Sequence, residues 1–193
     1  MVTTDAFDTG EPYTGGEIEA NLRRLHEESD RFLSALSPVA FVTPQGEKWS
    51  PADHARHLAK STFPLVRALG FPRLLIRVRF GRHPGPSRSF VALREDYRAR
   101  LRAGGTAGKF APAPKPLPDD PEAYRLRVLS SWRNAVTSLR SEFERWPEPD
   151  LDRYQLPHPL LGRLTVREML FFTLYHNAHH LNLVASRSKP APP

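Results

Sequence analysis

Two histidines four residues apart, His176 and His180, are the side chains in this sequence best suited to bind a metal ion. They lie in the stretch 164–188, where apolar residues recur at steps of three and four, the pattern of an amphipathic helix. Both fall on the apolar stripe, where side chains four apart are neighbours about 5–6 Å apart at Cβ. Two imidazoles at that spacing can hold one ion, with Zn–N distances of about 2.0–2.1 Å. His179 lies at the edge of the stripe and is less well placed.

A hydrogen-bonded core role is the alternative for these histidines, because a neutral imidazole is buried at little cost when both nitrogens have partners. Zinc-peptidase chemistry is excluded, since the HExxH motif needs a glutamate where this chain has Asn177. No catalytic residue can be assigned. Tyr175 and Asn177 flank His176, but a helix directs their side chains away from an ion held there.

The composition is that of a globular protein, with 193 residues of which 39% are hydrophobic and 25% charged. The chain has no cysteine, so metal ligands must come from His, Asp or Glu. No run of about 18 apolar residues occurs, and the N-terminal stretch is polar, so we expect a bacterial cytoplasmic protein without membrane contact. We expect one domain over 1–193, with flexible ends at 1–13 and 188–193.

The net charge of +7 and the pI of about 10.1 raise nucleic acid as a partner. The basic excess is concentrated between Arg73 and Lys115. No helix-turn-helix, zinc-finger or RNA-recognition pattern accompanies it, and the arginine bias also fits a GC-rich genome. Nucleic-acid binding is therefore the least favoured function.

Four helices are expected near 15–36, 51–69, 120–146 and 164–187, and each begins with a recognisable cap. The expected caps are Thr14, Ser50, Asp120 and Thr165, the last forming a capping box with Glu168. The segments 38–48 and 148–162 are expected to be loops.

The long connection between the second and third helices is harder to interpret. Residues 71–80 fit a short strand or the continuation of a helix, and residues 90–104 have a helical pattern. The Gly/Pro-rich segment 103–118 predicts a mobile crossover that passes over the bundle or lines a site.

Three more histidines need an interpretation. His57 lies on the inward face of the second helix beside Leu58, which predicts burial, and small residues around it leave room for a ligand. The inward face can also be drawn through His54, but at the second turn of the helix solvent exposure is its simpler interpretation. His158 stands between two prolines, and we expect it at the surface.

Two motifs together resemble the DinB/YfiT-like superfamily over nearly the whole chain. They are W-S-P-x-D-H-x-x-H-L at 49–58 and H-P-L-L-G-x-L-T-x-x-E-M-L…Y-H-N-A-H-H-L-N at 158–182. The resemblance implies an all-α fold, a four-helix bundle with a long crossover connection. It also implies a divalent metal ion, zinc or nickel, held by one histidine of the second helix and an H-x-x-x-H pair of the fourth. Carried over to this chain, these metal ligands are His57, His176 and His180.

The resemblance further implies a metal-dependent enzyme, in particular a thiol-dependent S-transferase that uses a small-molecule substrate and a low-molecular-weight thiol. A non-catalytic metal-binding or stress-response protein is the alternative. A homodimer is an assembly state that the sequence leaves open. Residues 80–118 match no motif of the family, so the substrate stays open as well.

Overall fold

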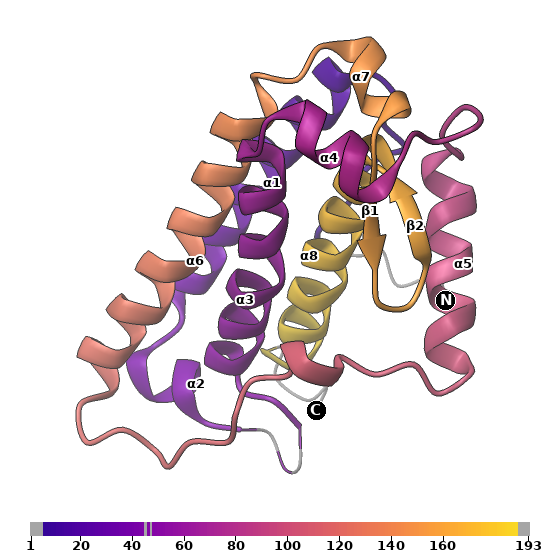
Figure 1. Cartoon of the computed structure of the whole chain (residues 1–193). Coiled ribbons are helices and arrows are strands. Elements are labelled where there is room, and N and C mark those ends of the chain that lie inside the picture. The colour runs from indigo at the N-terminus through magenta and orange to yellow at the C-terminus, as the bar shows by residue number, and fades with distance from the viewer. Residues whose placement is uncertain (1–5, 45, 47, 189–193) are drawn as a thin grey trace.

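Four long helices form a bundle in the computed structural model, which describes residues 6–44, 46 and 48–188. They are α1 (Gly15–Ala35), α3 (Pro51–Gly70), α6 (Pro121–Phe143) and α8 (Val166–Ser188). Helix α3 packs against α6 and α8, and α1 packs against the same two helices (Figure 1). The predicted all-α fold and its four main helices are confirmed.

Each bundle helix begins at a capped residue because its first backbone N–H groups have no partner inside the helix. Thr14 and Ser50 form capping boxes with the acidic residues three positions later. The Asp120 side chain accepts a hydrogen bond from the Ala123 backbone at 2.9 Å. Thr165 accepts from the Glu168 backbone and donates its own N–H to the Glu168 carboxylate, both at 3.0 Å.

The apolar stripes face a common core, as predicted. Trp132 on α6 is only 1% exposed and Phe143 only 4%. The other residues of the predicted α6 stripe are also buried: Val128, Ala135, Leu139 and Trp146. On α1 the stripe is buried at Ile18, Leu22 and Leu25 and half-buried toward the end of the helix.

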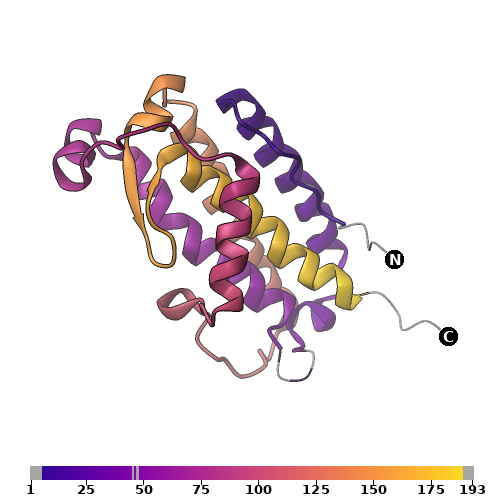
Figure 2. The ribbon, with the colours of Figure 1, turned by 90° about the vertical axis from the view of Figure 1, so that its right-hand side faces the viewer.

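The long crossover from α3 to α6 contains two further helices and a short helical turn, η1 (Gly108–Phe110). The stretch that fitted a strand or a helix is helix α4 (Arg73–Phe80), which buries Ile76 and leaves Leu74, Leu75 and Val78 exposed. Helix α5 (Phe90–Arg102) packs against α8 (Figure 2). The crossover therefore covers one side of the bundle.

Both predicted loops contain regular structure, so these two expectations are wrong. Helix α2 (Pro38–Val42) is capped by Ser37 and buries Phe41 in the core. Before α8 come helix α7 (Glu148–Arg153) and an antiparallel hairpin of β1 (Gln155–His158) and β2 (Gly162–Thr165). The hairpin turn needs a glycine, since Gly162 has a φ of 74°. Contacts with α3 and α6 stabilise α2, and contacts with α8 stabilise α7 and the hairpin, so the local sequence alone does not predict these short elements.

The N-terminal segment is attached more closely than expected. Phe7 is buried against Phe32, with ring centroids 5.4 Å apart. Its backbone exchanges two hydrogen bonds of 2.9 Å with the Asn182 side chain on α8. The expected flexibility of residues 1–5 and 189–193 lies outside the described residues. Within the part of the chain that the structure describes, no helix is long and apolar enough to cross a membrane.

Candidate metal centre

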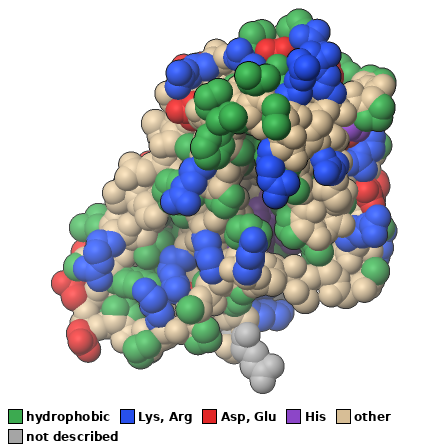
Figure 3. All heavy atoms as spheres, viewed as in Figure 1, with side chains coloured by type: hydrophobic (Ala, Val, Ile, Leu, Met, Phe, Trp, Pro, Cys, Tyr) green, Lys and Arg blue, Asp and Glu red, His purple; other side chains and the backbone are tan. Residues whose placement is uncertain are grey.

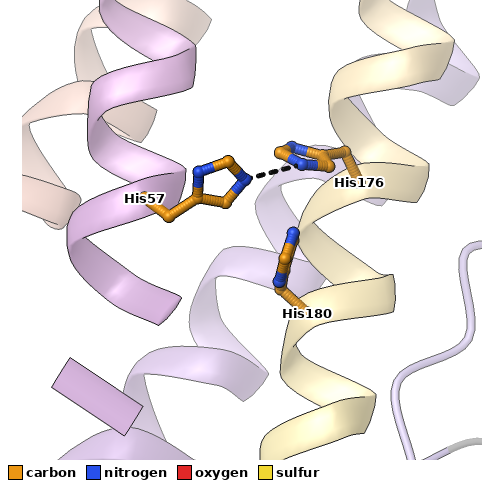
Figure 4. A group of neighbouring side chains, drawn as sticks. All are labelled: His57, His176 and His180. Carbon is orange, nitrogen blue, oxygen red and sulfur yellow. Dashed lines mark hydrogen bonds between the residues drawn. The ribbon is translucent and has the colours of Figure 1, made fainter. Parts of the chain in front are cut away.

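Three histidines from two bundle helices meet in the interior of the molecule. His57 comes from α3, and His176 and His180 come from successive turns of α8. One ring nitrogen of each lies within 4.8 Å of those of the other two. Nε2 of His57 is 3.0 Å from Nε2 of His176, and a ring nitrogen of His180 points toward both (Figure 4). The structure thus brings together the three residues that were predicted as metal ligands.

The spacing of these nitrogens suits one small divalent ion. In a tetrahedral site with bonds of about 2.0–2.1 Å, neighbouring ligand nitrogens lie about 3.3 Å apart. The His57–His176 separation of 3.0 Å is close to that value, and a nitrogen of His180 lies within 4.8 Å of both. A set of three imidazoles suits transition-metal ions such as zinc, copper, iron and nickel.

The second ring nitrogen of two of these histidines is held by a neighbour. Nδ1 of His57 donates to the Phe110 carbonyl at 2.9 Å, so Nε2 of the neutral ring keeps its lone pair for a ligand. Nδ1 of His180 lies 2.8 Å from Nδ1 of His54. His54 is 4% exposed, so the expectation that it faces solvent is wrong. It lies one turn before His57 on α3, where contacts with His180 and Trp49 bury its ring.

A cavity of 480 Å³ opens beside the histidine cluster. Its walls come from α3, α4, α5, the hairpin and α8, and six apolar contributors are Leu65, Ile76, Tyr97, Leu156, Met169 and Phe172. The described lining contains no acidic side chain and one arginine, Arg67. On this face the surface is hollowed, with a histidine visible inside and Lys and Arg side chains around the opening (Figure 3). The candidate centre therefore faces a largely apolar chamber.

Comparison with known families agrees with this architecture. Residues 22–184 match the profile of the DinB superfamily. The chain belongs to the DinB superfamily. The resemblance expected from the two sequence motifs is thereby confirmed. No curated protein and no solved structure with which the chain was compared matches it.

In this DinB-superfamily protein the candidate ligands are neutral at physiological pH. Burial lowers the pKa of His57, an effect that the Phe110 carbonyl partly opposes. Burial also lowers the pKa of His176 and His180 well below the ordinary value of 6.5, and the neighbouring imidazoles add to this effect. Neutral imidazole is the form that binds a metal, so the environment favours the ligand state.

Trp49 packs against the cluster and was not singled out as a site residue, although it opens the first sequence motif. Its ring stacks on His180, with centroids 5.8 Å apart and planes inclined by 13°. It also contacts His57 at 5.1 Å and His54 at 5.5 Å. This packing restricts rotation of the His54, His57 and His180 rings. His179, in contrast, is half-buried at the cavity wall and is not part of the three-histidine group.

His158 is a further residue of the site that sequence reasoning misplaced. It is 8% exposed and lines the cavity, so the expectation of a surface position is wrong. The hairpin packs on α8 and brings the His158 ring against Phe172, with centroids 4.2 Å apart. Burial lowers the pKa of His158 to about 4. The sequence signal that could have indicated a site position for His158 was its place as the first residue of the second motif.

Proposed function

We propose that this protein is a metal-dependent enzyme whose His57, His176 and His180 hold a divalent ion, zinc or nickel. The observation that carries the proposal is the position of the three imidazoles beside a 480 Å³ apolar cavity. A structural metal site is usually closed by four protein ligands, whereas three protein ligands leave a position for a substrate. A small molecule bound in the cavity would lie next to that position.

The reaction that we propose joins the sulfur of a low-molecular-weight thiol to an electrophilic carbon of an apolar acceptor. The thiol loses its proton to solvent, and the acceptor releases a leaving group such as chloride as the carbon–sulfur bond forms. A bound divalent ion would supply a Lewis acid that favours the thiolate form of a coordinated thiol at neutral pH. The apolar walls of the cavity would hold the acceptor and exclude water around the reacting atoms. His57 is kept in the correct tautomer by the Phe110 carbonyl, so the crossover supports the same function.

The test is turnover by protein loaded with zinc or with nickel. Glutathione, mycothiol and bacillithiol would each be supplied with an apolar electrophile such as 1-chloro-2,4-dinitrobenzene, and loss of free thiol would be followed. We expect thiol consumption with at least one of the three that stops after chelation and in His57→Ala, and that persists in His179→Ala. Consumption at the same rate with and without metal would contradict the proposal, as would the absence of consumption with all three thiols.

Nucleic-acid binding receives less support because much of the basic segment is paired with carboxylates. Arginines of this segment form salt bridges with Asp or Glu at Arg73, Arg88, Arg94, Arg98 and Arg100. A phosphate-binding surface would need these guanidinium groups free. A cytoplasmic location and a homodimer stay predictions.

A further inference from the structure

His158 is placed so that its ring meets the cavity beside the histidine cluster. It is the last residue of β1 and lines the same cavity as His176. Its ring packs edge-on against Phe172, and Phe172 in turn stacks on His176, with centroids 4.9 Å apart. A ligand bound in the cavity can therefore contact both His158 and the candidate metal centre.

The hairpin turn determines which nitrogen of His158 carries the proton. Nδ1 accepts hydrogen bonds from the backbone N–H groups of Leu160 at 3.2 Å and Leu161 at 3.1 Å. An atom that accepts two N–H groups cannot itself carry a hydrogen, so the neutral ring is protonated at Nε2. The lowered pKa of about 4 keeps the ring neutral at physiological pH, because burial disfavours the charged form.

Nε2–H is then a donor without an acceptor among the residues that the structure describes. Each hydrogen bond of the His158 ring among these residues uses Nδ1, so Nε2 makes none. Nε2 is also not among the fully buried unpaired atoms, so part of its surface is open to a ligand. The polar atom that His158 can offer to a ligand is consequently an N–H group in mostly apolar surroundings. There a hydrogen bond to oxygen is stronger than in water.

We propose that His158 binds the substrate by donating its Nε2–H to an oxygen acceptor of an apolar molecule, such as the carbonyl oxygen of a ketone. This inference deepens the proposed function and rests on it in one respect, that the cavity is the substrate site. A fixed neutral donor suits an oxygen that gains negative charge during a reaction, because it needs no rearrangement as the charge develops. The cavity therefore takes a ligand with an apolar body and one oxygen acceptor.

The competing interpretation is that His158 only stabilises the hairpin turn, and two substitutions separate the roles. In His158→Asn the side-chain carbonyl can replace Nδ1 as acceptor for Leu160 and Leu161, but no group replaces the Nε2–H. In His158→Gln the longer side chain can carry an amide N–H toward the position of Nε2. A turn-stabilising role is kept by Asn, whereas a ligand-binding role is kept by Gln.

The experiment uses two ligands of similar shape, 2-acetylnaphthalene and 2-isopropylnaphthalene, of which only the first has an oxygen acceptor. Binding to the chelator-treated full chain would be measured by the change in tryptophan fluorescence. We expect the wild type to bind the ketone about five- to tenfold more tightly than the hydrocarbon, the effect of one buried hydrogen bond. His158→Asn should lose that preference and keep its affinity for the hydrocarbon, while His158→Gln should retain part of the preference.

Equal affinity of the wild type for both ligands would overturn the proposal, as would failure to bind either one. An unchanged ketone preference in His158→Asn would also overturn it and would leave the turn as the role of the residue. Thermal unfolding of each variant shows whether the fold is kept. Since the binding test needs no metal, its outcome is independent of a failure to bind zinc or to consume thiol, which would contradict the proposed function alone. Nitrogen-15 NMR that placed the ring proton on Nδ1 would contradict the inference without any ligand.

Discussion

At the scale of single residues, the candidate ligands are held by what their second ring nitrogen contacts. His180 is paired through Nδ1 with His54, a residue outside the three-histidine group. If Nε2 of His180 binds the ion, Nδ1 must carry the ring proton and donate it to Nδ1 of His54. The buried Nε2 of His54 has no partner among the described residues, so its burial lowers the stability of the fold. A role in orienting His180 would explain why such a residue is placed here.

Replacing His54 by alanine should therefore weaken zinc binding about 10- to 100-fold, the range typical of residues that orient a ligand. The affinity would be measured by competition with a chromophoric chelator, with His179→Ala as the matched control on the edge of the site. We expect His179→Ala to bind zinc nearly as the wild type does. Identical affinities of His54→Ala and the wild type would show that the His54–His180 contact has no part in metal binding.

The lowered pKa of His158 makes the stability of the metal-free protein depend on pH. Its pKa is about 4 in the folded chain against 6.5 as the ordinary value, so between these values the unfolded chain binds more protons. The stabilisation is present above pH 6.5 and is lost as the pH falls toward 4. From pH 7 to pH 5 this residue alone should lower the free energy of unfolding by about 2 kcal/mol.

Urea unfolding with chelator present at pH 7 and pH 5 would measure this effect. The decrease should be larger for the wild type than for His158→Asn by about 2 kcal/mol, because asparagine does not titrate. The other buried histidines lower the stability of both proteins alike and cancel in the comparison. The same decrease in both proteins would mean that His158 is not buried as a neutral ring.

At the scale of elements, the starts of the bundle helices were predictable because a cap is a local signal. Thr14, Ser50, Asp120 and Thr165 each accept the hydrogen bond that the sequence led us to expect. Helix α2 and the hairpin were missed because they are short and depend on packing against other elements. The burial of His158 follows from the position of that hairpin, so it could not be predicted either.

The core stripe of α6 can be tested with a matched pair of substitutions. Trp132 is 1% exposed, and Trp132→Ala should lower the free energy of unfolding by about 3–5 kcal/mol through lost burial and the resulting cavity. Leu126 on the same helix is 52% exposed, and Leu126→Ala should change it by no more than about 0.5 kcal/mol. Denaturant unfolding followed by circular dichroism measures both. Similar losses for the two variants would contradict the described orientation of α6.

The mobility of the segment 104–118 stays a prediction, and the structure adds a link to the site. Side chains of α3 bind three of its backbone carbonyls: Arg56 that of Ala113, His57 that of Phe110, and Lys60 that of Ala111. We expect faster hydrogen exchange here than in α8, because few backbone groups are paired.

Zinc should slow this exchange, since the His57 tautomer that binds the ion is the one bonded to Phe110. Equal protection of the segment and of α8 from exchange would contradict the predicted mobility. A zinc effect that persists in His176→Ala would show that the effect does not come from the proposed metal centre.

At the scale of the whole molecule, the candidate centre exists only when the bundle closes. His57 and His176 are 119 positions apart in the chain, and their ring nitrogens meet because α3 and α8 pack side by side. Their convergence was expected from the family resemblance together with the helical spacing of His176 and His180. The cavity was not predictable, because its walls come from α4, α5 and the hairpin, whose placement depends on the crossover.

The most direct test of the account is a calorimetric zinc titration of the full chain, purified without an affinity tag and treated with chelator, beside its His176→Ala variant. Removing one of three protein ligands should eliminate tight binding, because two imidazoles hold the ion far less strongly than three. We predict one zinc ion per chain for the wild type and an affinity at least about 100-fold lower for His176→Ala, with both proteins folded. The same zinc affinity in the two proteins would contradict the proposed metal centre.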